Sequence, residues 1–336
     1  MGWWQVSADT LAGSRFVVSP LAETIAGLKV LERGSAAHPG ERAWLDAHRP
    51  AYRARQEADP VTAQLIRAAL GPTWNADFLT PTPDPEAYDS AGPSFEEEVA
   101  RVRDAPPEAA RADLLVSLGS KGPLPAPLRR DDLPGRMADT LEWVWRETVR
   151  PYWARRRRII EADVVARTAQ LSRGGWAAAL DDMRPGMRWL GESRLQINTR
   201  TYPPRELAGA RLMFVPVTPH TGWVSWEAAV DRPSRYAVVY PCAGALAGAL
   251  GEAEGVPVSE ALGALLGRAR ATVLVLLDSP KSTSQLVALT GQGLGSVGHH
   301  LRVLREARLI QRRRAGRSVL YYRTPAGDCL LRAVQR

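Results

Sequence analysis

Residues 257–336 follow an order of elements that few folds share. A helix opens after Ser282, a short glycine-bearing turn follows, and a second helix runs from about residue 294 to 307 with Val297, Leu301 and Leu304 on one face. An arginine run, a tight turn and an alternating strand over 318–323 then form a β-hairpin. Two helices joined by a short turn and followed by a two-stranded wing predict a winged helix-turn-helix.

The charge of the chain is concentrated in the same segment. The 336 residues carry a formal net charge of +8. Residues 257–336 hold 13 arginines and lysines against 4 acidic residues, whereas the first 256 residues hold 31 basic and 32 acidic residues. A basic module beside a neutral body is the electrostatic pattern expected of nucleic-acid binding. We therefore expect double-stranded DNA as the partner of the C-terminal module.

A winged helix-turn-helix reads DNA with the second helix of the pair, which enters the major groove, while the wing meets phosphates or the minor groove. The helix start, the turn, the second helix and the wing supply the side chains that we expect at DNA: Ser282, Thr283, Gln292, Ser296, Val297, His299, His300, Arg302, Arg305, Arg313, Arg314, Arg317 and Tyr321.

The stretch SVGHHLRVLREARLI over 296–310, followed by residues 312–322, resembles the ArsR/SmtB family of bacterial transcriptional regulators. The resemblance implies a homodimer held by the first and last helices of this domain, and repression that a signal relieves. The cysteine-containing metal-sensing motif of the family is absent, since Ser284-Gln285-Leu286-Val287 stands in its place. We therefore expect no metal and no other cofactor. Gly298 stands where the family usually has serine.

The rest of the chain resembles, less specifically, the long N-terminal extension of actinobacterial members of this group, a resemblance that implies no activity. It depends on the segments 15–21, 38–39 and 77–81. Overall we expect an α+β protein in three parts: a mainly helical region 1–175, a small β-rich region with a linker 176–256, and the winged helix-turn-helix 257–336. Four strands of one small antiparallel sheet are predicted at 194–198, 212–217, 223–226 and 236–240.

A long helical region is predicted from about Met137 to Gly174, with a break at Pro151. It contains four consecutive arginines, Arg155 to Arg158, which cannot share one helical face because successive positions turn by about 100°. We interpret this run as a charged helix surface or an interface with acidic neighbours, and keep a second DNA site as the alternative.

Nothing in the first 256 residues has the pattern of a catalytic centre, because no Ser-His-Asp order, carboxylate pair or HExxH is found. The GxGxxG match over 293–298 lacks the acidic residue and the length of chain that a dinucleotide-binding fold needs. A ligand pocket, where one exists, is expected to be lined by tryptophans: Trp143, Trp176, Trp189, Trp223 and Trp226.

These observations predict a transcriptional repressor, not an enzyme, that binds an inverted-repeat operator as a homodimer and senses an unknown small-molecule effector through its N-terminal region. The longest apolar run, residues 242–250, is too short to span a bilayer and no secretory signal is visible, so no membrane contact is expected. The expected location is the cytoplasm, at the nucleoid. The alternatives are a small-molecule-binding enzyme with an incidental basic tail, and a metal sensor.

Overall fold

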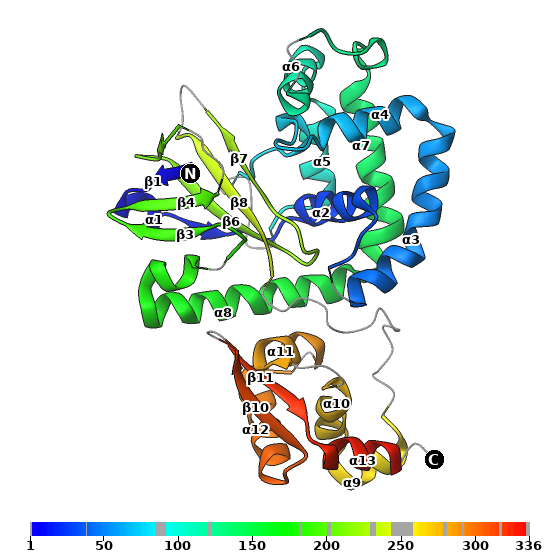
Figure 1. Ribbon diagram of the computed structural model, residues 1–336, viewed down its shortest axis with the longest axis vertical. Helices are drawn as coiled ribbons and strands as arrows, with labels where there is room; N and C mark the ends of the chain where they lie inside the picture. The colour runs from blue at the N-terminus through cyan, green and yellow to red at the C-terminus, as the bar shows by residue number, and fades with distance from the viewer. Residues whose placement is uncertain are drawn as a thin grey trace.

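The computed structural model describes residues 2–37, 39–84, 92–119, 122–181, 183–199, 203–228, 233–242, 258–277, 281–290, 292–315 and 318–333. Helices and two sheets form the N-terminal region, and a smaller helical domain with a hairpin forms the C-terminal end (Figure 1). The predicted α+β class is confirmed. No helix in these ranges combines the length and the hydrophobicity needed to cross a membrane.

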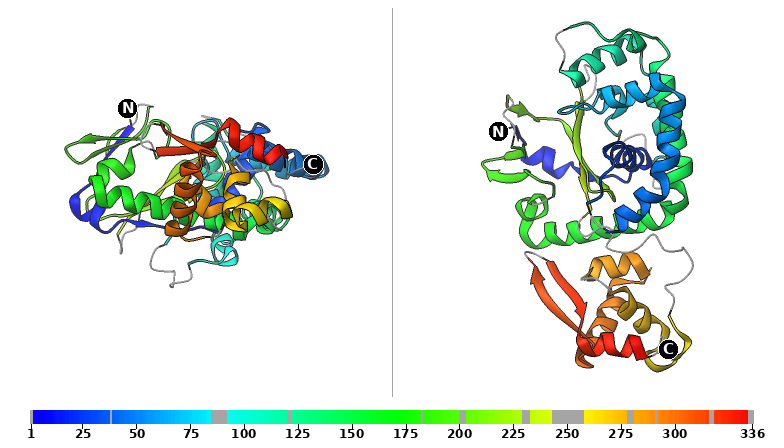
Figure 2. Two further views of the ribbon diagram at one scale, coloured as in Figure 1. Left: turned by 90° about the horizontal axis from the view of Figure 1, so that it is seen from below. Right: turned by 45° about the vertical axis from the view of Figure 1, so that its right-hand side comes forward.

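Helix α2 (Pro20–Arg33) is the centre of the N-terminal region. Ser19 caps it by accepting a hydrogen bond from the Ala22 amide, and Gly34, with φ of 68°, ends it in the left-handed conformation that glycine adopts easily. It contacts α3 (Pro39–Ala58), α5 (Phe95–Arg103) and α7 (Leu133–Val144), while α4 (Pro60–Ala69) and α6 (Pro107–Leu118) pack against α7 (Figure 2). Its apolar residues are therefore buried on all sides.

The long helical region breaks at the predicted proline. Helix α7 passes into a π-helical turn, η3 (Trp145–Val149), and a 3-10 turn, η4 (Arg150–Tyr152), before α8 (Trp153–Leu180) begins. Pro151 has no N–H to donate to the helix, so the backbone rearranges around it. The helix also continues six residues beyond the predicted end, across a kink at Gly175, whose φ is 65°.

In the described part of the N-terminal region, eight strands form two four-stranded sheets. One has the order β2-β6-β8-β7 and the other β3-β4-β1-β5. Their bounds are β1 (Gly2–Gln5), β2 (Arg15–Phe16), β3 (Arg188–Gly191), β4 (Arg194–Asn198), β5 (Arg205–Glu206), β6 (Arg211–Val217), β7 (Trp223–Glu227) and β8 (Arg235–Pro241). All four predicted strands are present, as β4, β6, β7 and β8.

The predicted single antiparallel sheet is wrong. Strands β6 and β8 pair in parallel, with Arg211 opposite Arg235 and Val217 opposite Pro241, and β4 lies in the other sheet. The reason is that β8 inserts between β6 and β7, so consecutive strands β6 and β7 are not neighbours. Local alternation fixes which residues form strands but leaves their pairing open.

Alternate residues of β6 and β8 face two different cores. Met213 and Val239 pack with the helices around α2, while Phe214 and Tyr240 pack with strand β1 and the end of α8. The regions predicted as 1–175 and 176–256 therefore share both cores. The predicted boundary near residue 255 lies outside the described residues.

Candidate nucleic-acid interface

The C-terminal domain has its own core, separate from the two cores above. Its elements are α9 (Glu260–Leu266), α10 (Arg268–Leu276), β9 (Lys281–Ser282), α11 (Thr283–Thr290), α12 (Leu294–Glu306), β10 (Ile310–Ala315), β11 (Ser318–Arg323) and α13 (Pro325–Ala333). The core is built from Leu262, Ala271, Val273, Leu274, Leu277, Leu286, Val297, Leu301, Leu304, Ile310 and Leu331. The strands form a three-stranded sheet in the order β10-β11-β9.

Helix α11 begins as the sequence predicts. The Ser282 hydroxyl accepts a hydrogen bond from the Gln285 amide at 3.3 Å, and the Gln285 side-chain oxygen accepts one from the Ser282 amide. This reciprocal pair satisfies backbone donors at the start of the helix. Helix α11 also lies against α8 of the N-terminal region (Figures 1 and 2).

Helix α12 presents a polar face to solvent. Ser296, His299 and Arg302 are exposed along it, and Arg305 is partly exposed one turn further. Steps of three residues turn each side chain by about 60° from the one before, so Ser296, His299 and Arg302 share one side of the helix, whereas Arg305 lies opposite Ser296 near the C-terminal end. Side chains so placed can donate and accept hydrogen bonds at base edges, while the arginines carry the positive charge that phosphates attract.

A short polar chain orders the first turns of α12. The Ser296 hydroxyl donates to Gln292 Oε1 at 3.1 Å and lies 3.2 Å from His300 Nε2. His300 Nδ1 is buried without a hydrogen-bond partner in the described part of the chain. Burial, followed by the charges of His299 and Arg270, lowers the pKa of His300. The ring is therefore neutral at pH 7, and it can position Ser296 without adding charge.

The wing is a regular hairpin. Ile310 pairs with Arg323 and Ala315 with Ser318, at opposite ends of the antiparallel ladder. Arg312 and Arg313 are exposed on β10. Arg317 and the side chain of Arg314, both predicted at DNA, lie outside the described residues.

Two of the predicted contact residues belong to the core instead. Val297 is 0% exposed and packs among Leu286, Leu301 and Leu304, so its side chain is unavailable to DNA. Tyr321 is partly buried against the same core. Ser282 and Thr283 are partly buried at the start of α11. The prediction overlooked Leu294, which is 56% exposed in the first turn of α12.

The fold and the polar face of α12 together define a winged helix-turn-helix DNA-binding domain. Residues 270–312, from α10 to the start of the wing, match the family model described as bacterial regulatory protein, arsR family. The predicted resemblance of this domain is confirmed, and the domain supports a role of the protein in DNA binding and transcription regulation. Neither a curated protein nor a solved structure matches the chain.

The five tryptophans predicted around a ligand do not line one pocket. Trp143 and Trp223 pack in or against the core around α2, whereas Trp176 and Trp189 pack against the other core of the N-terminal region. Trp226 meets Trp74 edge-on, with ring centres 5.5 Å apart. Large aromatic side chains fill cores in most folds, so their number alone did not locate a site.

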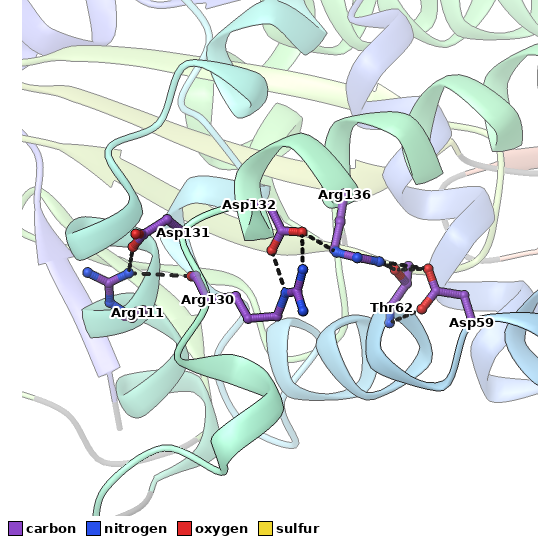
Figure 3. A network of polar contacts seen from close by, with 7 residues as sticks. All are labelled: Asp59, Thr62, Arg111, Arg130, Asp131, Asp132 and Arg136. Atoms are coloured by element: carbon purple, nitrogen blue, oxygen red, sulfur yellow. Dashed lines mark hydrogen bonds and ion pairs between the residues drawn. The ribbon is translucent and has the colours of Figure 1, made fainter.

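A cavity of about 190 Å³ lies instead between α3, α4 and α7. Its wall includes Arg136, which bridges two helices: Nη1 donates to Asp59 Oδ2 at 2.9 Å and Nε to Asp132 Oδ2 at 2.8 Å (Figure 3). Asp132 also accepts two hydrogen bonds from Arg130. These arginines hold the pKa of Asp132 well below its usual range. Within this wall the positive charge of Arg136 is therefore already paired with carboxylates.

The arginine run divides between the interior and the surface. Arg156 is buried, with its Nη1 donating to Glu23 Oε1 at 2.6 Å and its guanidinium 5.1 Å from the centre of the Trp44 ring. Arg157 is exposed and pairs with Glu161 one turn away at 2.9 Å. These contacts match the interpretation of the run as a set of positions with acidic neighbours.

No group of three or more histidine, cysteine or acidic side chains in the described ranges could hold a metal ion. Both cysteines are free: Cys242 is buried and Cys329 is exposed on α13.

Proposed function

We propose that this protein is a repressor that binds an inverted-repeat operator as a homodimer. The observation that carries the proposal is the exposed row Ser296, His299 and Arg302 on α12, within a domain that matches an ArsR-family model. Residues 258–333 would read DNA and contribute α9 and α13 to the dimer, and the remainder would sense an effector, add to the dimer, or both.

The dimer is supported by the apolar surface of the first helix of the domain. Leu265 on α9 is 64% exposed, so its side chain is available to pack against a second copy of the domain. Helix α13 presents the partly buried Leu330 beside the buried Leu331. Two such domains related by a twofold axis would require half-sites separated by one or two turns of DNA.

The contact between α11 and α8 supports sensing by the N-terminal region. Helix α11 packs on α12, so a ligand that favoured another position of α8 would bias the placement of the reading helix. A transcriptional regulator acts at the nucleoid in the cytoplasm, which is where we propose that this protein is located.

The test selects operator fragments from genomic DNA with the purified protein and then measures their affinity for variants. S296A and H299A should alter sequence preference, because both side chains lie at the expected base edges. R313A should weaken binding to all duplexes alike. It should also reduce the slope of log affinity against log salt concentration by about 1. The matched control is R157A on α8, an exposed arginine outside the domain, which should change neither quantity.

Two results would refute the assignment of roles. One is a steep salt dependence that is the same in wild type, S296A, H299A and R313A. The other is selection of DNA without any recurring sequence. Analytical ultracentrifugation with L265E tests the dimer: the glutamate should dissociate it, and an unchanged dimer would place the interface elsewhere.

A further inference from the structure

The partly enclosed cavity of about 190 Å³ lies where α4 packs against both α3 and α7. All three helices contribute residues to its wall. Ala63 and Ile66 of α4 are buried there, whereas Arg55 of α3 and Asp139 of α7 are exposed. An apolar cavity of about 150 Å³ in another protein binds benzene, so this space can hold a six-membered ring with one small substituent.

The two carboxylates of the cavity wall already have basic partners. Asp59 Oδ2 accepts a hydrogen bond from Arg136 Nη1 at 2.9 Å (Figure 3). Asp139 Oδ1 lies 2.9 Å from Arg103 Nη1. A cationic ligand would therefore find the acidic groups of the wall neutralised.

Arg55 differs from the other charged residues of the wall. Its guanidinium lies 5.7 Å from the centre of the Trp143 ring, and no carboxylate of the described residues forms an ion pair with it. The ring of Trp143 in turn lies 6.4 Å from that of the buried Tyr52, another residue of the wall, measured between ring centres. A guanidinium that lies over an aromatic ring keeps its N–H groups available to donate. The cavity thus has one positive charge at its exposed edge without an acidic partner.

We propose that this cavity binds a small organic acid, whose carboxylate pairs with Arg55 and whose ring packs against Ala63 and Ile66. A guanidinium can hold a carboxylate through two parallel N–H···O hydrogen bonds. Ala63 and Ile66 are 4% and 2% exposed, so a ring beside them is removed from water, which favours binding. One unmatched positive charge suits a monoanion, whereas a phosphate group would bring about two negative charges beside Asp59 and Asp139.

The test titrates the full-length protein with benzoate and, separately, with benzamide, which has nearly the same shape without the charge. Isothermal titration calorimetry at constant ionic strength measures both affinities. We expect saturable binding of benzoate that R55M weakens more than tenfold, because a hydrogen-bonded charge pair is lost. Benzamide should bind at least tenfold more weakly than benzoate, and R55M should not change its affinity. The matched control is R42M, which replaces an exposed arginine of the same helix outside the cavity wall, 3.8 Å from Asp46, and should bind benzoate as wild type does.

Two more variants test whether the ligand lies inside the cavity. A63L enlarges a buried residue of the wall and should weaken benzoate binding more than tenfold, with urea unfolding as the check that the fold is kept. W143F should bind benzoate with unchanged affinity but lose most of the change in tryptophan fluorescence, because Trp143 lies against Arg55. R55M changes an exposed side chain, so its result decides the proposal even where A63L fails to fold.

Four results would overturn the proposal. Benzoate fails to bind saturably, R55M binds benzoate as wild type does, benzamide binds as tightly as benzoate, or R42M loses as much affinity as R55M. Unchanged benzoate affinity in a folded A63L variant would likewise exclude this cavity.

A regulatory role of this cavity rests on the proposed function and is measured apart, as the operator affinity of wild type and R55M with and without benzoate. Benzoate that binds through Arg55 and leaves operator affinity unchanged would refute sensing by this cavity, while the binding site itself would stand. A protein that binds benzoate but selects no operator would instead refute the proposed function.

Discussion

Replacing Arg156 by methionine should test how the buried part of the arginine run contributes to stability. The side chain of Glu23 is 0% exposed and that of Arg156 5% exposed, and their closest atoms are 2.6 Å apart. Glu23 also accepts hydrogen bonds from the amide and the hydroxyl of Thr218. The glutamate thus joins α2, α8 and the end of β6, and methionine would keep most of the arginine's volume while removing its charge.

The expected loss follows from burial. Removing one partner of a buried ion pair typically costs about 3–5 kcal/mol, because the other charge stays buried and uncompensated. The neighbouring pair of Arg157 and Glu161 is about half exposed on each side, and such helical pairs contribute about 0.3–0.5 kcal/mol. We therefore expect R156M to lower the free energy of unfolding by about 3 kcal/mol more than R157M does.

Urea unfolding at pH 7, followed by tryptophan fluorescence, measures both variants. The double variant E23Q/R156M should recover part of the loss, since it removes the unpaired charge. A free energy for R156M within about 0.5 kcal/mol of that for R157M would refute the reasoning from burial. A reduced salt slope of DNA binding in R157M would instead favour the alternative of a second DNA site.

Three further predictions concern other positions. As pH rises from about 8 to 10.5, the free energy of unfolding of wild type should increase by up to about 3 kcal/mol relative to that of K29M. The reason is that the pKa of Lys29 is about 8 in the folded protein, so the unfolded chain keeps the proton to higher pH. A difference between the two unfolding free energies that does not change with pH would contradict this. Gly298→Ala should stabilise by about 0.5–1 kcal/mol, since a Cβ there meets nothing within 4 Å and glycine disfavours helix; a lower melting temperature would count against it. L304A, at a fully buried site, should cost about 2–5 kcal/mol in urea unfolding, whereas L294A at a site 56% exposed should cost far less; equal losses would disprove the assigned faces of α12.

Sequence reasoning worked best in the C-terminal domain. The second helix was predicted over about 294–307 and is found over Leu294–Glu306, and Ser282 caps α11 as expected. Caps, helical periodicity and hairpin alternation depend on residues a few positions apart. The same patterns therefore placed Ser296, His299 and Arg302 on the outer face, although Val297 was wrongly included with them.

Elsewhere the sequence misled in identifiable ways. Strand β1 was not predicted, because its four residues become a strand only by pairing with β4, almost 200 positions later. The five tryptophans suggested one pocket, but four of them divide between two cores and Trp226 instead meets Trp74.

The sequence by itself determined the DNA-reading module and the position of its charge, because both depend on short-range spacing and composition. Only the tertiary structure decided the parallel pairing of β6 with β8. It also decided which arginines are buried and which carboxylate each of them meets. Arg156 and Arg157 are adjacent in the chain, yet one meets Glu23 in the interior and the other meets Glu161 at the surface. Burial and partner set the energy of a charge, and both are properties of the fold.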